Sequence, residues 1–436
     1  MHTRIALALG VGWALDSFEV QIINSVIGPI AHEFGLSETQ QILVYAPWFV
    51  GILVGALVCG WLADRVGRRR LFVGTLLLYS TFAMLTALSW NFESLLGFRF
   101  VTGLGVGGEY AVVASAIAEF VPARHRGRTN ATVMNFWALG GIAAGLAGIL
   151  FLTAFADSAA GWRVTLMFGG VSALFALYAR RVIPESPRWL ASRGRTQEAN
   201  AIVTELTGEA TAEVEDVRAA PPPAFRPQLR ELWSHHRGRL LLGMTLDFSE
   251  AAAYYGLFTF VAAFVLVPDV VAVSDSLRPV YFLVGNVGAL AGGLTVAWAL
   301  ERFGRKPTNV VTYAAAAASV VVLAGAASTS SPALPLAAFT VAVFFATTAW
   351  VGAYPTFSEL FPTHLRATGV GASVAVGRVG AIIGTIGLGL TTSAFGITSG
   401  FLLLAAFWAV GAVAATIWLL RGVEARGVPL ELLAET

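Results

Sequence analysis

The amino-acid sequence predicts an all-α membrane protein with twelve transmembrane helices in two pseudo-symmetric six-helix bundles. Three observations support this fold class: an apolar composition, apolar segments long enough to cross a bilayer, and an internal duplication. Hydrophobic residues make up 56% of the 436-residue chain and charged residues only 12%, and the mean hydropathy is +0.72. This composition excludes an ordinary soluble globular protein.

The expected helices come from apolar runs of about 20 residues, the length that crosses a hydrocarbon core about 30 Å thick. We expect helices at 5–30, 42–62, 71–89, 94–121, 130–155, 163–182, 240–267, 278–300, 308–328, 333–361, 368–394 and 397–420. Glycines such as Gly140, Gly141 and Gly145 interrupt these runs without polar neighbours. In lipid such small residues favour close helix packing, so we interpret them as helical.

The duplication is visible at the least apolar positions of the chain. The paired segments are 119–126 with 359–366, 15–19 with 246–250, and 60–70 with 298–306. The three pairs occur in the same order at a similar offset. Parallel repeats of this kind are typical of one class of secondary transporter.

Basic residues predict the orientation in the membrane. They gather in three loops, as Arg65, Arg68, Arg69, Arg70, Arg124, Arg126, Arg128, Arg302, Arg305 and Lys306. The alternate loops, at 31–41, 90–93, 268–277 and 329–332, lack Arg and Lys. By the positive-inside rule, the basic loops and both termini are expected in the cytoplasm. Arginine supplies all basic residues but Lys306, which is typical of a GC-rich bacterial genome and indicates a bacterial plasma (inner) membrane.

The one long polar stretch divides the chain. We expect an N-terminal bundle at 1–182, a cytoplasmic linker with short helices at 183–238, a C-terminal bundle at 239–420 and a cytoplasmic tail at 421–436.

Several functional classes lack their sequence signals. There is no phosphate-cradling Gly-Lys loop, no metal-ligand spacing of Cys and His, and no supported Ser/His/Asp arrangement. We therefore expect no enzyme activity, no metal and no cofactor, with the proton as coupling ion. The net charge of +2 is a topology signal, so no nucleic-acid partner is expected. The expected partners are a small-molecule substrate and the lipid bilayer, around a monomer. Cys59 is the single cysteine, which excludes an intrachain disulfide.

Four motifs follow one another along the chain. They are G-W-L-A-D-R-V-G-R-R-R at 60–70, R-x3-G-x-G-x-G-G-E at 99–109, P-E-S-P-R-W-L at 184–190, and Y-x3-S-E-L-F-P-T-x2-R-A-T-G at 354–369 with G-R-V-G at 377–380. With them the chain resembles a major facilitator superfamily transporter, in the branch of sugar porters and metabolite:proton symporters that includes aromatic-acid and organic-ion transporters. The resemblance implies the major facilitator fold and alternating access.

The chain also departs from the sugar porters. Their seventh helix carries a Gln-Gln pair that binds sugar hydroxyls, whereas this chain has Asp247 and Glu250 there, followed by Tyr254 and Tyr255. A hexose is therefore not the expected substrate. Metabolite:proton symporters resemble the chain more closely, and their first helix reads D-G-F-D where this chain reads D-S-F-E at 16–19. The resemblance implies that Glu19 occupies the position of the proton-coupling carboxylate.

Buried charges are the candidate coupling residues, because a carboxylate in a membrane helix must pair, protonate or face water. Asp16 and Glu19 lie one turn apart on one helix face, and Arg99 is the expected counter-ion. Proton binding to Glu19 would weaken its hold on Arg99 and shift the conformational balance. A static buried salt bridge is the alternative. Glu109 is a further candidate that either lines the cavity or packs against small residues.

Substrate contacts are expected where the two halves face each other. The candidates are Glu250, Tyr254, Tyr255, Arg378, Trp137, Tyr354 and Asn286. Arg378 either binds a substrate carboxylate through its planar fork or pairs with Glu359. Asp247 either faces the cavity or lies near the cytoplasmic opening.

A second group of charges is expected to latch the two halves together on the cytoplasmic side. This gate comprises Asp64, Arg65, Arg68, Glu119, Arg126, Glu185, Arg188, Glu301, Arg302, Glu359 and Arg366. The resemblance implies that these latches hold the outward-facing state. Exposed ion pairs contribute little, so the latches must be partly buried.

The sequence thus predicts a secondary active transporter, a proton-coupled symporter of a small polar or organic-acid metabolite. The alternatives are a proton-linked exporter of organic ions, a proton-independent facilitator and a nutrient receptor that does not transport.

Overall fold

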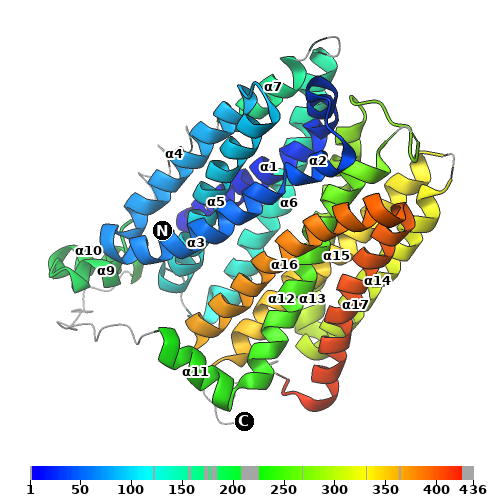
Figure 1. Ribbon diagram of the computed structural model, residues 1–436. Coiled ribbons are helices and arrows are strands. Elements are labelled where there is room, and N and C mark those ends of the chain that lie inside the picture. Colours follow the sequence, from blue (N-terminus) through cyan, green and yellow to red (C-terminus); the bar gives the residue numbers. More distant parts are fainter. Residues whose placement is uncertain are drawn as a thin grey trace.

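All regular secondary structure in the described residues is helical, and they contain no strand. The computed structural model describes residues 2–120, 123–155, 158, 160–170, 175, 178, 184–207, 225–267, 269–329, 331–362 and 365–424. Two helical bundles lie side by side, one from the first part of the chain and one from the last (Figure 1).

The N-terminal bundle comprises α1 His2–Phe34, α2 Glu38–Leu43, α3 Ala46–Val66, α4 Arg68–Ala87, α5 Phe92–Phe120, α6 Ala123–Ala154, α7 Ala160–Met167 and η1 Phe168–Gly170. The helices between the bundles are α9 Pro187–Ser192, α10 Thr196–Thr207 and α11 Phe225–His235. The C-terminal bundle comprises α12 Arg237–Phe260, η2 Val261–Val265, α13 Arg278–Phe303, α14 Arg305–Ala327, α15 Ala333–Leu360, α16 Arg366–Phe395 and α17 Ile397–Arg421.

We call the end of the molecule where α9, α10 and α11 lie the linker end. Both ends of the chain are marked toward it, whereas α2 and α7 lie at the far end (Figure 1). The first helix therefore begins, and the last helix ends, on the same side of the molecule.

The expected helices agree closely with the observed ones. Nine helical segments in the described residues are long and apolar enough to cross a membrane. Helix α1 is not among them, and it carries Asp16, Glu19, Gln21 and Asn24 in its middle. Side chains in the second part of α5 and most of the expected helix at 163–182 lie outside the described residues. The nine segments and α1 account for ten of the twelve expected helices, and the other two, at 94–121 and 163–182, lie partly outside the described residues.

Glycines let the helices approach to backbone contact. A Cβ built on Gly103 of α5 would lie 2.2 Å from the carbonyl oxygen of Trp48 in α3. In the other bundle, a Cβ on Gly384 of α16 would lie 2.4 Å from the carbonyl oxygen of Ala252 in α12. Neither position has room for a larger residue, as expected for small-residue interfaces between membrane helices.

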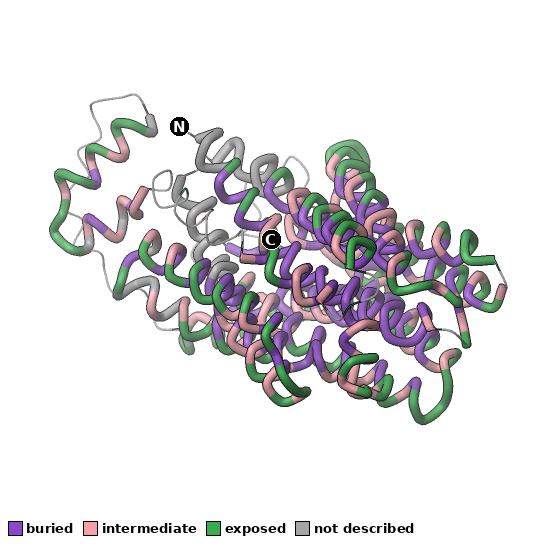
Figure 2. Tube along the Cα trace, turned by 90° about the horizontal axis from the view of Figure 1, so that it is seen from above, coloured by how far each residue is buried: buried purple, intermediate pink, exposed green. Residues whose placement is uncertain are grey.

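Burial separates the centre of the molecule from its surface. Purple, buried segments lie inside and green, exposed ones outside (Figure 2). Helix α12 is central, with 89% of its most apolar window buried, whereas the corresponding figure for α17 is 22%. The exposed positions of the outer helices carry large apolar side chains such as Leu294, Leu402 and Leu420. An apolar outer surface of this kind suits lipid rather than water.

The two bundles meet along α6 with α13 and along α3 with α16. The amide of Asn286 in α13 donates to Gln21 Oε1 in α1 over 2.7 Å. Nearer the far end, the hydroxyl groups of Thr39 and Ser393 are 2.9 Å apart. The interdomain contacts thus extend from the middle of the molecule to its far end.

Candidate substrate and proton site

Six charged side chains lie buried in the middle of the helices. Each is less than a tenth exposed: Asp16, Glu19, Arg99, Asp247, Glu250 and Arg378. Charges at such positions are costly in a membrane and are a default marker of function. They form two clusters, one in each half of the molecule.

The N-terminal cluster is built around one ion pair. Arg99 Nη1 of α5 lies 2.9 Å from Glu19 Oε1 of α1, and the two side chains are 1% and 3% exposed. The guanidinium also lies over the ring of Trp48, 5.6 Å from its centroid. Asp16, one turn before Glu19, is fully buried. Arg99 thus pairs with Glu19, the counter-ion arrangement that the sequence predicts.

The C-terminal cluster has the same charges in a different arrangement. Asp247 and Glu250 of α12 lie close enough to Arg378 of α16 for electrostatic interaction. Arg378 Nη1 donates to the hydroxyl group of Tyr255 over 3.2 Å. Tyr354 is a hydrogen-bond partner of the Asp247 carboxylate. Four residues expected at the substrate site from sequence, Glu250, Tyr255, Tyr354 and Arg378, therefore lie together.

Asp247 has its place because α16 carries a glycine opposite it. A Cβ on Gly377 would lie 1.8 Å from Asp247 Oδ2. The Gly-Arg sequence at 377–378 thus makes room for the carboxylate and supplies its counter-charge. Asp247 is thus buried between α12 and α16, and its two expected roles, at the cavity or near the cytoplasmic opening, stay predictions.

A small pocket lies between the two halves. Its lining residues are Val20, Gln21, Asn24, Tyr45, Trp48, Phe49, Arg99, Trp137, Tyr254, Tyr255, Phe258 and Thr259. The open space among them holds about one water molecule. A ring-sized ligand would therefore require the aromatic walls to separate.

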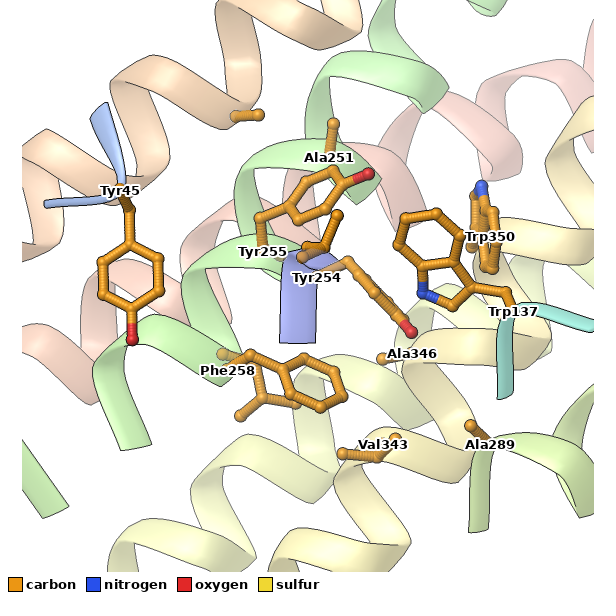
Figure 3. Close-up of a cluster of buried hydrophobic side chains, with 14 of the residues drawn as sticks. Tyr45, Trp137, Ala251, Tyr254, Tyr255, Phe258, Ala289, Val343, Ala346 and Trp350 are labelled. Carbon is orange, nitrogen blue, oxygen red and sulfur yellow. The ribbon is translucent and has the colours of Figure 1, made fainter. Parts of the chain in front are cut away.

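Aromatic rings form most of this wall and bridge the halves (Figure 3). Phe49 of α3 meets Tyr255 of α12 edge to face, with ring centroids 4.9 Å apart. Trp137 of α6 meets Trp350 of α15 at 5.6 Å. Tyr254, which also packs on Trp350, points into the same space. Such a wall suits a flat, partly apolar molecule.

An amide network crosses the interface beside the pocket. Asn286 donates to Gln21, and Gln21 Nε2 donates to Ser17 Oγ over 2.9 Å. Ser17 in turn donates to the carbonyl oxygen of Trp137 over 2.5 Å. Asn286 was expected at the site, but Gln21 and Asn24 were not. Two amides three residues apart in an apolar helix were the signal that identifies them.

The predicted cytoplasmic gate lies at the linker end, and part of it is described. Both nitrogens of the Arg305 fork lie 2.9 Å from the carboxylate oxygens of Glu359. Since α14 and α15 belong to the same half, this pair does not bridge the bundles. Glu359 thus pairs with Arg305, whereas Arg378 interacts with the C-terminal cluster and Tyr255. Glu301 and Arg302 are exposed and make no ion pair with a described residue.

At this end, two acidic side chains accept hydrogen bonds from the N-termini of α4 and α14, which occupy equivalent places in the two halves. Glu185 accepts from the backbone N–H of Arg69 in α4 over 3.2 Å. Glu424 accepts from the backbone N–H groups of Arg305 and Lys306 in α14, both over 3.0 Å. A carboxylate is favoured at a helix N-terminus because it satisfies free N–H groups. Glu185 was predicted at the gate, whereas Glu424 was not predicted and Arg305 was predicted only as a basic loop residue.

The remaining candidates fall on side chains outside the described residues. They are Asp64, Arg65, Arg68, Glu109, Glu119, Arg126, Arg188 and Arg366. Their roles stay predictions.

Comparison with known proteins adds to this geometry. Residues 14–436 match the family model "Sugar (and other) transporter". The chain is 32% identical to the niacin transporter NiaP of Acinetobacter baylyi, over 88% of this chain and 86% of that protein. It is 28% identical to the putative niacin/nicotinamide transporter NiaP of Bacillus subtilis, over 87% and 86%.

Among solved structures, the fold matches the xylose transporter XylE of E. coli. The TM-score is 0.76 at 19% identity, over 100% of this chain and 99% of that chain. At this identity the likeness shows the fold alone.

Proposed function

Because this chain belongs to the sugar (and other) transporter family of the major facilitator superfamily, we propose that it is a proton-coupled symporter of a small aromatic carboxylate. It is a multi-pass metabolite transporter, not an enzyme, and its curated relatives include bacterial proteins. The observation that carries the coupling proposal is the Glu19–Arg99 ion pair in the wall of the pocket.

The ion pair supports coupling because it is both buried and dependent on one proton. The free-energy cost of removing the two charges from water is offset by their mutual attraction, which requires that both stay ionised. A proton on Glu19 neutralises the carboxylate and releases Arg99, which lines the pocket. The freed guanidinium then attracts an anionic substrate, so proton and substrate bind together. A ligand that favours one conformation shifts the balance between the two openings.

The substrate class follows from the pocket and the relatives. Flat aromatic walls, with Arg99 in the lining and Arg378 bonded to the lining residue Tyr255, suit a planar ring that carries a carboxylate. A guanidinium binds a carboxylate through two parallel hydrogen bonds. Two relatives are named as niacin transporters, so nicotinate is the first substrate to test.

We place the linker end in the cytoplasm of a bacterium, because the arginine-rich loops lie there. In this orientation the interdomain contacts of the far end close the outer side of the transporter. The Thr39–Ser393 contact and the amide network of Asn286 must then separate when the outer side opens.

The test is uptake of radiolabelled nicotinate into liposomes that contain the purified protein. With an inside-alkaline pH gradient, nicotinate is expected to accumulate above its outside concentration, and a protonophore is expected to abolish the accumulation. Equilibration without accumulation would identify a facilitator. Absence of both uptake and binding would remove nicotinate as a substrate.

A further inference from the structure

We propose that Asp247 and Glu250, together with Arg378, form a second proton-binding site in the C-terminal half of the transporter. The inference rests on the proposed proton-coupled function and adds to it a second coupling carboxylate. The site consists of two side chains from the central helix α12 and one from α16.

Charge counting gives the first argument. Asp247 and Glu250 are 1% and 4% exposed and lie one helical turn apart. Arg378, 6% exposed, is the guanidinium that interacts with both. If both carboxylates were ionised, the buried cluster would keep an excess negative charge, and two nearby carboxylates disfavour ionisation of both. A bound proton removes this excess.

Hydrogen bonding gives the second, independent argument. The Glu250 carboxylate accepts no hydrogen bond from any described residue and makes no ion pair within the salt-bridge distance. Asp247 Oδ1 is buried without a partner in the described part of the chain. Buried carboxylates are normally satisfied, and an exception has a physical reason. A protonated acid group has the lower desolvation cost and accounts for the missing partners.

The surroundings of the cluster are phenolic rather than charged. The titratable groups that interact with the two carboxylates are Arg378 of α16, Tyr354 of α15, Tyr313 of α14 and Tyr254 of α12 itself. Phenols remain neutral and can donate or accept hydrogen bonds. Arg378 is thus the sole cation among these groups, so the carboxylates compete for one positive charge.

Asp247 and Glu250 occupy the positions in the second half of the sequence that correspond to Asp16 and Glu19 in the first half. Asp16 and Asp247 are 231 positions apart, and so are Glu19 and Glu250 (247 − 16 and 250 − 19). The counter-ions do not follow the repeat, because Arg99 comes from α5, the fourth span, and Arg378 from α16, the eleventh. The two halves therefore share acidic pairs of equal spacing and differ in how the guanidinium reaches them.

The position of the pair connects it to the substrate pocket. Glu250 lies one turn before Tyr254, which lines the pocket, and Arg378 is bonded to Tyr255, which also lines it. A substrate carboxylate that draws the Arg378 fork toward the pocket weakens its hold on Asp247 and Glu250. The pair then takes up a proton. Substrate binding and protonation are coupled in the C-terminal half as well.

The experiment is infrared difference spectroscopy of the carboxylic-acid C=O stretch during pH titration of the purified, substrate-free transporter. Above about pH 6, where freely exposed carboxylates are already ionised, wild type is expected to show two titrating contributions, one from each half. Glu250→Gln is expected to lower the titrating amplitude by about half and to leave the contribution that Glu19→Gln removes. Glu205→Gln, on the exposed linker helix α10, is the matched control and is expected to match wild type.

Asp247→Asn provides a second variant if Glu250→Gln does not yield folded protein. Wild-type amplitude in both variants would overturn the proposal, and so would a band that responds to sodium and not to pH. The measurement needs no substrate. If nicotinate is not taken up but wild type shows both titrating contributions, only the proposed substrate is contradicted. If both variants titrate like wild type, the second proton-binding site is contradicted.

Discussion

In the N-terminal half Arg99 contacts Glu19 directly over 2.9 Å, whereas in the C-terminal half Arg378 donates to the phenol of Tyr255. Both guanidinium groups are buried, and the helix that carries the acidic partner of each has two buried carboxylates one turn apart. The first is held by a charged partner and the second partly by a neutral one. The guanidinium is ionised in both hydrogen bonds, but only the bond to Glu19 joins opposite charges, so it is the stronger of the two.

This difference indicates a division of roles. Releasing Arg99 requires neutralisation of Glu19, so the N-terminal cluster responds first to the proton. In the proposed mechanism, Arg378 exchanges the phenol of Tyr255 for a substrate carboxylate at lower cost, so the C-terminal cluster responds first to the substrate. The same buried charges thus support two steps of one cycle.

Removal of Arg99 is expected to have the largest effect. Arg99→Ala leaves Glu19 as a buried charge without its partner, which destabilises a protein by about 3–5 kcal/mol. We expect a large fall in melting temperature and loss of both uptake and exchange of nicotinate. Arg99→Ala combined with Glu19→Gln should recover much of the stability, because no lone charge remains. Equal melting temperatures in the single and double variants would contradict the pairing argument.

Neutralisation of Glu19 alone is expected to separate coupling from transport. Glu19→Gln keeps the shape of the side chain and removes its titration. Accumulation of nicotinate driven by a pH gradient should disappear, while counterflow exchange between equal pH should persist. Continued accumulation in the variant would place the coupling elsewhere, and Glu109 would be the next residue to test.

Substitution of Arg378 is expected to weaken binding of an anion without unfolding the bundle. Arg378→Lys keeps a point charge but loses the planar fork, and we expect about tenfold weaker nicotinate binding, equal to about 1.4 kcal/mol. Calorimetric titration with nicotinate measures the change, and nicotinamide, which lacks the negative charge, should show a smaller one. If Arg378→Ala binds nicotinate like wild type, Arg378 is a structural residue and the substrate is neutral or cationic.

The amide network between the halves is expected to have a smaller effect. Asn286→Ala removes the hydrogen bond to Gln21, a loss of about 1 kcal/mol. Because the bond joins the two bundles, the loss should favour separation on that side. Labelling of an introduced cysteine at Ser393, near the far end, should become faster. Unchanged labelling would show that this contact does not stabilise the closed outer side.

Substitution of the acidic residues at the helix N-termini of the linker end should change stability least. Glu424→Gln weakens the interaction with the N-terminus of α14 by about 0.3–1 kcal/mol. Glu185→Gln should act similarly on α4. Melting temperatures should fall slightly while nicotinate affinity stays constant. A strong loss of affinity in either variant would connect these residues to the substrate site.

Much of the fold was predictable from sequence because membrane helices have few alternatives. The length of the apolar runs predicted the membrane-spanning helices, and the order of the four motifs predicted the family. The pairing of Glu19 with Arg99 was predictable as well, since a lone buried charge in α1 requires a partner.

Other parts depend on three-dimensional geometry that sequence patterns do not contain. The partner of Glu359 is Arg305, because α14 and α15 pack within one half, whereas the duplicated motif indicated contacts across the halves. The neighbourhood of Asp247, Arg378 and Gly377 depends on the register of α12 against α16. Gln21 and Asn24 were missed because amides in an apolar helix are less conspicuous than charges.

The most direct test of the account is the number of protons that enter with each nicotinate ion. Proteoliposomes with a pH-sensitive dye inside and radiolabelled nicotinate outside report both fluxes at once. With one coupling carboxylate in each half, about two protons should accompany each nicotinate, so that an inside-negative potential accelerates uptake. Nicotinate entry without proton entry would contradict the account, and one proton per nicotinate without response to the potential would contradict the second site.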